Sequence, residues 1–165
     1  MRKHSCSAMV IAALALVTTA CGDDDSAVER EARETVTSVT ERAEEATRLT
    51  ATLTGPAEAP TPGDPDGTGT ATINLDATAG RVCYEVAVQK IDRPVGMHIH
   101  EGETGTSGPI VVGLTTPTAS DTTTTGCADA DRTLIGRIAA MPGDFYVNVH
   151  SDRYPQGAVR GQLSQ

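Results

Sequence analysis

The sequence predicts an all-β fold, an antiparallel β-sandwich of about seven strands with one short helix. Three observations support this class. From residue 50 onward, apolar residues recur at every second position, which is the side-chain period of a β-strand. Clusters of Gly, Pro, Asp and Thr interrupt this alternation, as turns do between short strands. With no Trp, one Phe and three Tyr, the core must be built from aliphatic side chains.

The alternation defines the predicted elements in chain order. The predicted strands are 49–54, 68–76, 81–89, 95–100, 110–114, 144–150 and 157–163. Residues 131–140 carry apolar side chains at helical spacing instead, so they predict one short helix that ends before Pro142. The threonine-rich stretch 115–125 is predicted to be a loop.

The first 20 residues predict an export signal. Arg2 and Lys3 give a basic start, and residues 8–17 form an apolar run. That run is too short to span a bilayer core of roughly 30 Å. Residues 26–49 then show apolar positions three and four apart, typical of a helix, but the stripe is mostly Ala and Val. We expect a helical or flexible stalk over residues 21–49, with a coiled coil as the alternative.

The end of the leader, residues 16–21, resembles a bacterial lipoprotein cleavage site, in which a small residue precedes a cysteine that receives the lipid. Thr18 stands where such sites usually carry Leu. The resemblance implies a lipid on Cys21 and a protein anchored to the outer face of the cell membrane, in the extracytoplasmic space. Secretion with an unmodified Cys21 is the alternative. The expected organisation is a signal at 1–20, the anchored stalk, and one domain at 50–165.

Two cysteines remain in this domain, Cys83 and Cys127. An even pair in an oxidising compartment predicts a disulfide, which would contribute about 4 kcal/mol by closing a loop of about 45 residues. Two free thiols that act as metal ligands are the alternative.

Downstream of the leader, the histidines are His98, His100 and His150. His98 and His100 alternate with apolar residues, so they share one face of a strand with their Cα atoms roughly 6.6–7 Å apart. His150 likewise shares a polar face with Tyr146 and Asn148. If the two strands belong to one sheet, the three imidazoles form a patch.

Three imidazoles suit zinc or copper, and three protein ligands leave an open coordination position. The neighbouring loops could add Glu101 or Asp152 to the patch. Two alternatives remain open. The histidines can hydrogen-bond loop backbone and hold turns in place, or they can recognise a ligand without a metal.

Several function classes find no support in the sequence. The net charge of −9 disfavours nucleic-acid binding, which needs clustered Lys and Arg. No nucleophile motif or phosphate-binding glycine loop is present, so an enzyme is not expected. Residues 64–67 hint at a calcium loop, but Leu75 stands where the last acidic ligand belongs, and a turn is expected. Arg153 and Arg160 are expected to be salt-bridged or solvated, and nothing pairs Glu58 with Glu85.

Three separated blocks carry a wider similarity: Leu53-Thr54-Gly55 with Gly69-Thr70-Ala71, Gly96–Gly102 with Gly108-Pro109-Ile110-Val111, and Tyr146–His150 with Tyr154–Leu163. In this order they resemble the CHRD domain, named for repeats in the animal protein chordin, over about residues 50–165. The resemblance implies an all-β domain of secreted and surface proteins. It favours a non-enzymatic surface module that binds a protein, a cell-wall component or a small ligand.

A weaker resemblance links the segment His98-Ile99-His100-Glu101 and the later Val149-His150 to copper–zinc superoxide dismutase, another β-sandwich. It implies that His98, His100 and His150 are copper ligands. The sequence lacks a further histidine for a bridging ligand and the His/Asp zinc loop of that family. Copper binding is therefore compatible with the sequence, whereas superoxide chemistry is not expected.

Overall fold

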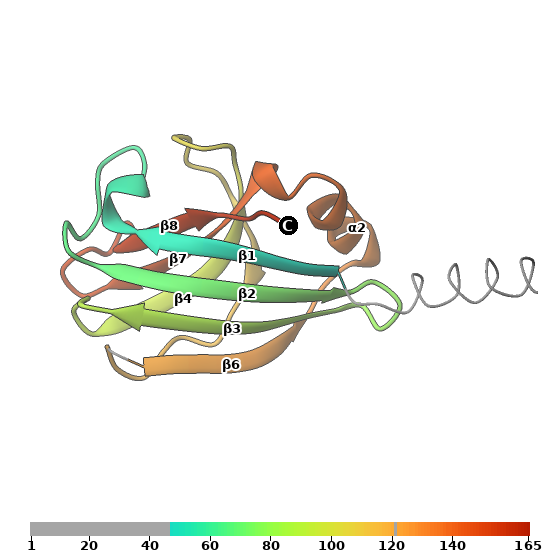
Figure 1. Cartoon of the computed structure of the whole chain (residues 1–165), viewed down its shortest axis with the longest axis horizontal. Coiled ribbons are helices and arrows are strands. Elements are labelled where there is room, and N and C mark those ends of the chain that lie inside the picture. The colour runs from blue at the N-terminus through green and yellow to red at the C-terminus, as the bar shows by residue number, and fades with distance from the viewer. Residues whose placement is uncertain (1–46, 121) are drawn as a thin grey trace, which may run out of the picture. The chain divides into compact units, whose positions relative to one another are not determined.

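The computed structural model describes residues 47–120 and 122–165, so the predicted signal, Cys21 and nearly all of the stalk lie outside the described residues. The described residues form eight strands, one α-helix and two 3-10 helices (Figure 1). The elements are β1 (Thr47–Thr54), η1 (Gly55–Ala57), β2 (Thr68–Asp76), β3 (Arg81–Gln89), β4 (Pro94–Glu101), β5 (Ile110–Gly113), β6 (Thr122–Asp129), α2 (Arg132–Ala140), η2 (Pro142–Asp144), β7 (Phe145–Ser151) and β8 (Val159–Gln162).

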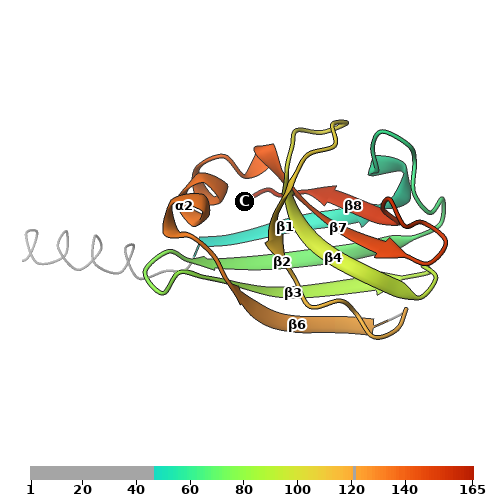
Figure 2. The same cartoon turned by 180° about the vertical axis from the view of Figure 1, so that it is seen from behind.

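The strands form one antiparallel sheet in the order β5-β4-β7-β8-β1-β2-β3-β6. At its middle, β1 and β8 pair through Thr54 and Arg160, and a bridge joins Thr50 to Ser164. Because this junction is short, the two halves fold over one another, and β4, β7 and β8 cross the layer of β1, β2, β3 and β6 (Figures 1 and 2). The predicted all-β, antiparallel sandwich with one helix is confirmed.

Aliphatic side chains from the facing sides of the two layers fill the core. Leu53 and Ile73 from one layer, and Met97, Ile99 and Val147 from the other, are fully buried. Each belongs to an alternating set, so the neighbours along its strand point to the opposite side. The histidines are therefore directed away from the core.

The predicted helix is confirmed as α2. Asp131 caps its first turn by accepting hydrogen bonds from the backbone N–H groups of Thr133 and Leu134, at 2.9 and 3.2 Å. Ile135 and Ile138 are buried against the sandwich. Within the described residues, no helix is both long and apolar enough to cross a lipid bilayer.

The loop predicted at 115–125 is wrong over its last four residues, because Thr122–Asp129 forms β6 and pairs along the length of β3. Its side chains alternate between half-buried and exposed, and none is fully buried. An edge strand of this kind places no apolar face in the core, so it leaves no apolar alternation in the sequence. At the other end of the domain, β1 begins at Thr47, two residues before the predicted start.

The predicted disulfide is confirmed. Cys83 and Cys127 lie directly opposite each other in β3 and β6, and their sulfur atoms are bonded at 2.10 Å. The alternative of two free thiols is therefore wrong. The bond attaches β6, which has no buried apolar anchor of its own, to the neighbouring strand. Disulfides of this structural kind are typical of proteins outside the cytoplasm.

Candidate metal site

The pairing of β4 with β7 brings the three histidines together. In this register His98 lies opposite Asn148, and His100 lies opposite Tyr146. His150 comes two residues after Asn148 in β7, so its side chain lies on the same face. One ring nitrogen from each histidine lies within 4.8 Å of the others. The predicted histidine patch is therefore present on the outer side of this layer.

The spacing of the ring nitrogens suits a common metal ion. His98 Nδ1 and His150 Nε2 are 3.2 Å apart. In a tetrahedral site with metal–nitrogen bonds of 2.0–2.1 Å, two ligand nitrogens are about 3.3–3.4 Å apart. These two histidines are already close to this spacing. The three ring nitrogens lie within 4.8 Å of one another, so metal binding needs the group to contract by at most roughly 1.4 Å.

His100 presents an unused nitrogen to the site. Its Nδ1–H donates to the carbonyl oxygen of Gly108 at 2.9 Å, so Nε2 carries the lone pair. Nε2 is buried and has no hydrogen-bond partner among the described residues. A buried acceptor without a partner costs about 1–3 kcal/mol, and a bound cation would remove that cost.

His150 is oriented in the same way. Its Nδ1–H donates to the carbonyl oxygen of Pro155 at 3.1 Å, which leaves Nε2 facing His98. The alternative that histidines bond to loop backbone is thus correct for His100 and His150. These bonds do not compete with metal binding, because a metal-bound histidine usually donates its other N–H to a carbonyl or carboxylate.

The half-exposed rings of His98 and His150 both favour the neutral form, which is the form that binds metals. Burial lowers the pKa of His98, and the neighbouring rings of His150 and His100 lower it further. Burial also lowers the pKa of His150, against an opposing contribution from the Pro155 carbonyl. Without a metal, neutral His98 donates its Nδ1–H to His150 Nε2.

Glu101 and Asp152, which the loops could add to the patch, do not join the histidine group in the structure. Glu101 forms an ion pair with Arg137, and Asp152 forms one with Arg93 at 2.8 Å. Within the described residues, the group that can hold a metal consists of the three histidines.

The polar side of this layer is largely covered and not open to solvent. The exposed fractions of Tyr146, Asn148 and Arg160 are 3%, 2% and 1%. The Arg160 guanidinium donates to the carbonyl oxygens of Thr106 and Glu103, at 2.6 and 2.9 Å, and lies 3.4 Å from the ring centroid of Tyr146. The expectation that Arg160 is solvated or salt-bridged is wrong, because the loop after β4 covers it.

Glu58 is a second buried charged residue that sequence reasoning missed. Its carboxylate lies against Gly157, where a Cβ atom would approach it to 2.4 Å. Burial raises the pKa of Glu58 to about 7, although the charge of Arg160 and a hydrogen bond from the Asn148 side chain act in the opposite direction. Its Oε1 atom has no hydrogen-bond partner in the described part of the chain.

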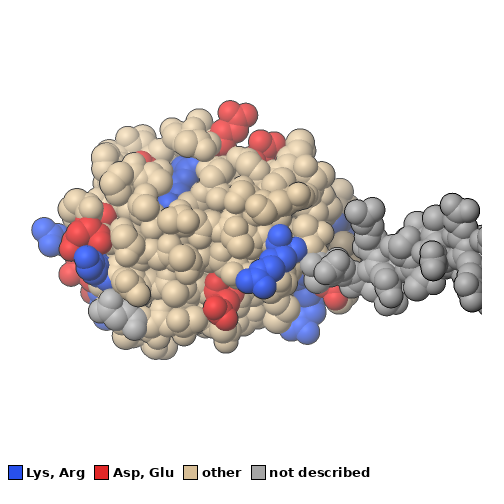
Figure 3. Space-filling view, viewed as in Figure 1, with Lys and Arg blue, Asp and Glu red and all other residues tan. Residues whose placement is uncertain are grey.

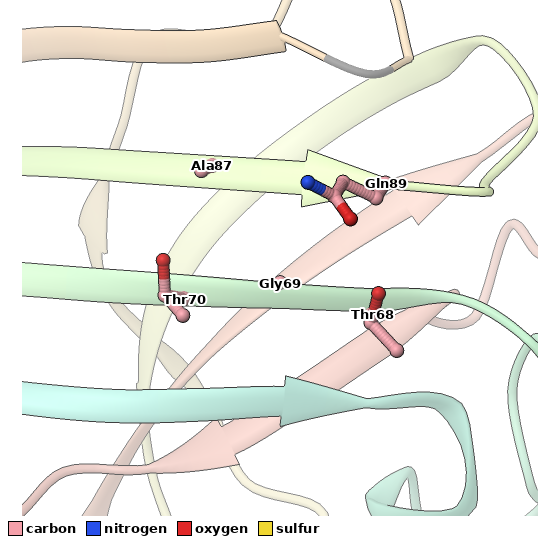
Figure 4. Close-up of a pocket in the computed structure, with 5 residues that line it drawn as sticks. All are labelled: Thr68, Gly69, Thr70, Ala87 and Gln89. Atoms are coloured by element: carbon pink, nitrogen blue, oxygen red, sulfur yellow. The ribbon is translucent and has the colours of Figure 1, made fainter.

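The opposite layer offers no comparable chemistry. Its outer face is mostly uncharged, as Figure 3 shows. A shallow hollow on β2 and β3 is lined by Thr68, Gly69, Thr70, Ala87 and Gln89 (Figure 4). None of these five residues is ionisable, and none is a usual metal ligand.

A family model described as the CHRD domain matches residues 49–163. No curated protein matches the chain.

Proposed function

The chain belongs to the CHRD-domain family, and on this premise we propose that its β-structured binding module binds a divalent zinc or copper ion outside the cytoplasm. The observation that carries the proposal is the convergence of His98, His100 and His150, with the His100 Nε2 lone pair buried and unused. Imidazole nitrogen is a good ligand for both metals.

Three neutral ligands from the protein leave the metal one open coordination position. The module can thus recognise a small molecule, or a side chain of a partner, through the metal itself. This mode of binding needs no catalytic residue, in keeping with a non-enzymatic surface protein.

Metal titration of the purified domain tests this function. We expect wild-type protein to bind one Zn²⁺ or Cu²⁺ ion, and the His100→Ala and His150→Ala variants to bind it at least about 100-fold more weakly, since each lacks one of three ligands. Gln89→Ala, on the opposite layer, is the control and should bind as the wild type does. A wild-type protein that binds neither metal at micromolar concentration, or a His100→Ala variant that binds normally, would refute the proposal.

We also propose that Cys21 carries a lipid that anchors the protein to the outer face of the membrane. The Cys83–Cys127 disulfide supports an extracytoplasmic location, and the leader supports export. When the full chain is expressed in a bacterium, we expect wild-type protein in the membrane fraction and Cys21→Ala in the soluble exported fraction. Cys6→Ala, which alters the leader instead, is the control. Wild-type protein that is fully soluble would contradict the anchor.

A further inference from the structure

The ring of His100 is held both at its edge and on its face. Its Nδ1–H donates to the Gly108 carbonyl oxygen, which fixes one edge. Its face stacks on Tyr146, with ring centroids 4.9 Å apart and planes inclined by 10°. A single hydrogen bond lets a ring tilt, whereas a stacked neighbour also fixes the ring plane. The two contacts together therefore determine where the buried Nε2 points.

Tyr146 is itself held firmly. Its hydroxyl accepts a hydrogen bond from the Gly108 backbone N–H at 3.3 Å, and the Arg160 guanidinium lies 3.4 Å from its ring centroid. Because β7 lies between β4 and β8, His100 and Arg160 approach the Tyr146 ring from opposite sides. The phenol ring is thus packed between an imidazole and a cation.

Gly108 connects these contacts, because its carbonyl oxygen accepts from His100 while its N–H donates to Tyr146. A Cβ atom at this position would lie 1.7 Å from the backbone oxygen of Glu101, so glycine is needed for the loop to pass this closely. Arg160 binds two other carbonyl oxygens of the same loop. The loop, the tyrosine and the histidine form one connected unit.

We propose that Tyr146 is a positioning residue that sets the metal affinity of the site by fixing the His100 ring, an inference that rests on the proposed metal-binding function. Tyr146 does not touch the metal in this arrangement. It acts by orienting His100 Nε2 and by holding Gly108, whose carbonyl oxygen accepts the hydrogen bond from His100. Partners of this outer kind typically change metal affinity about 10- to 100-fold.

Two substitutions separate the stacking face from the hydroxyl. Tyr146→Leu removes both, and we expect Zn²⁺ or Cu²⁺ to bind about 10- to 100-fold more weakly. Tyr146→Phe keeps the face, and we expect a loss of no more than about five-fold. Tyr84→Leu and Tyr84→Phe are matched controls. Tyr84 lies on β3, in the opposite layer, and its hydroxyl also accepts a hydrogen bond from a backbone N–H group, that of Thr115 at 2.8 Å.

A second measurement needs no metal. The NMR signal of the His100 Nδ1–H proton, protected by its bond to Gly108, should persist in Tyr146→Phe and in both Tyr84 variants. In Tyr146→Leu the signal should exchange with solvent and disappear. This signal reports the orientation of the His100 ring alone. A variant that is less stable but still folded keeps that orientation and therefore keeps the signal. If Tyr146→Leu does not fold, Tyr146→Met, which has a long side chain without a planar face, replaces it.

The outcomes distinguish the two proposals. A Tyr146→Leu protein that binds metal as tightly as the wild type overturns the inference and leaves the proposed function intact. If the wild type binds neither metal, the proposed function fails. In that case the inference about metal affinity fails with it, and the His100 signal of metal-free Tyr146→Leu shows only whether Tyr146 orients the ring.

Discussion

Replacing Arg160 with Met is expected to destabilise the domain by about 3–5 kcal/mol, as removal of one partner from a buried charged network generally does. Methionine keeps the aliphatic stem but leaves the carbonyl oxygens of Thr106 and Glu103 without their donor. It also removes the cation from the face of Tyr146 and leaves Glu58 without its positive neighbour. Urea unfolding of the variant and the wild type at pH 7 measures the difference.

The chain offers a matched control for this substitution. Arg153 also lies over a tyrosine, Tyr154, at 5.8 Å from the ring centroid, but it is exposed. Arg153→Met is expected to change stability by no more than about 0.5 kcal/mol. A loss below about 1 kcal/mol in Arg160→Met would show that its buried contacts contribute little. If that variant does not fold, Arg160→Lys supplies a measurable intermediate, because lysine keeps the charge without the planar group.

The alternation of apolar residues was sufficient to predict which face of each central strand enters the core. Met97 and Ile99 on one side of β4, with His98 and His100 on the other, lie as the two-residue period requires. The same period failed for β6, where threonines occupy both faces of an edge strand. Periodicity detects strands through the core that they build, so it misses a strand that contributes little to that core.

The histidine cluster was predictable for a related reason. Once β4 and β7 are neighbours, the alternation fixes the face on which His98, His100 and His150 lie. The covering of that face was not predictable, because it depends on the path of the loop after β4. Arg160 is buried by contacts with carbonyl oxygens more than fifty residues away in the sequence. Backbone acceptors leave no signature in side-chain patterns, so no local signal distinguishes this arginine from a solvated one.

Two buried ionisable residues lie close to the three histidines in this layer, so metal binding is expected to affect them. Arg160 and Glu58 place one cation and one titratable acid beneath the same polar face, and Asn148 contacts the acid while lying opposite His98. A divalent ion bound to three neutral imidazoles would add two positive charges to this neighbourhood. Such a charge favours the ionised form of a nearby carboxyl group. We therefore expect Glu58 to be less easily protonated in the metal-bound protein.

Glu58→Gln is expected to make the metal-free domain more stable than the wild type at high pH, with little difference below pH 4.5. Burial raises the pKa of Glu58 from 4.5 to about 7. Between these values the folded state holds a proton that the unfolded state has released, so the Glu58 contribution is fully present below pH 4.5 and is lost as pH rises through 7. A pKa difference of this size corresponds to about 3 kcal/mol.

The pH profile of the difference between variant and wild type isolates this acid. His98 and His150, whose pKa values are lowered, act with the opposite sign, since their unfolded forms gain protons first as the pH falls below 6.5. Their contributions cancel in the difference, because both proteins carry them. Unfolding in urea from pH 4 to 8.5, with the exposed Glu85→Gln as control, should give a difference that grows with pH only for Glu58→Gln. A constant offset across this range would mean that Glu58 ionises normally, so that its burial is relieved by solvent or by the guanidinium of Arg160.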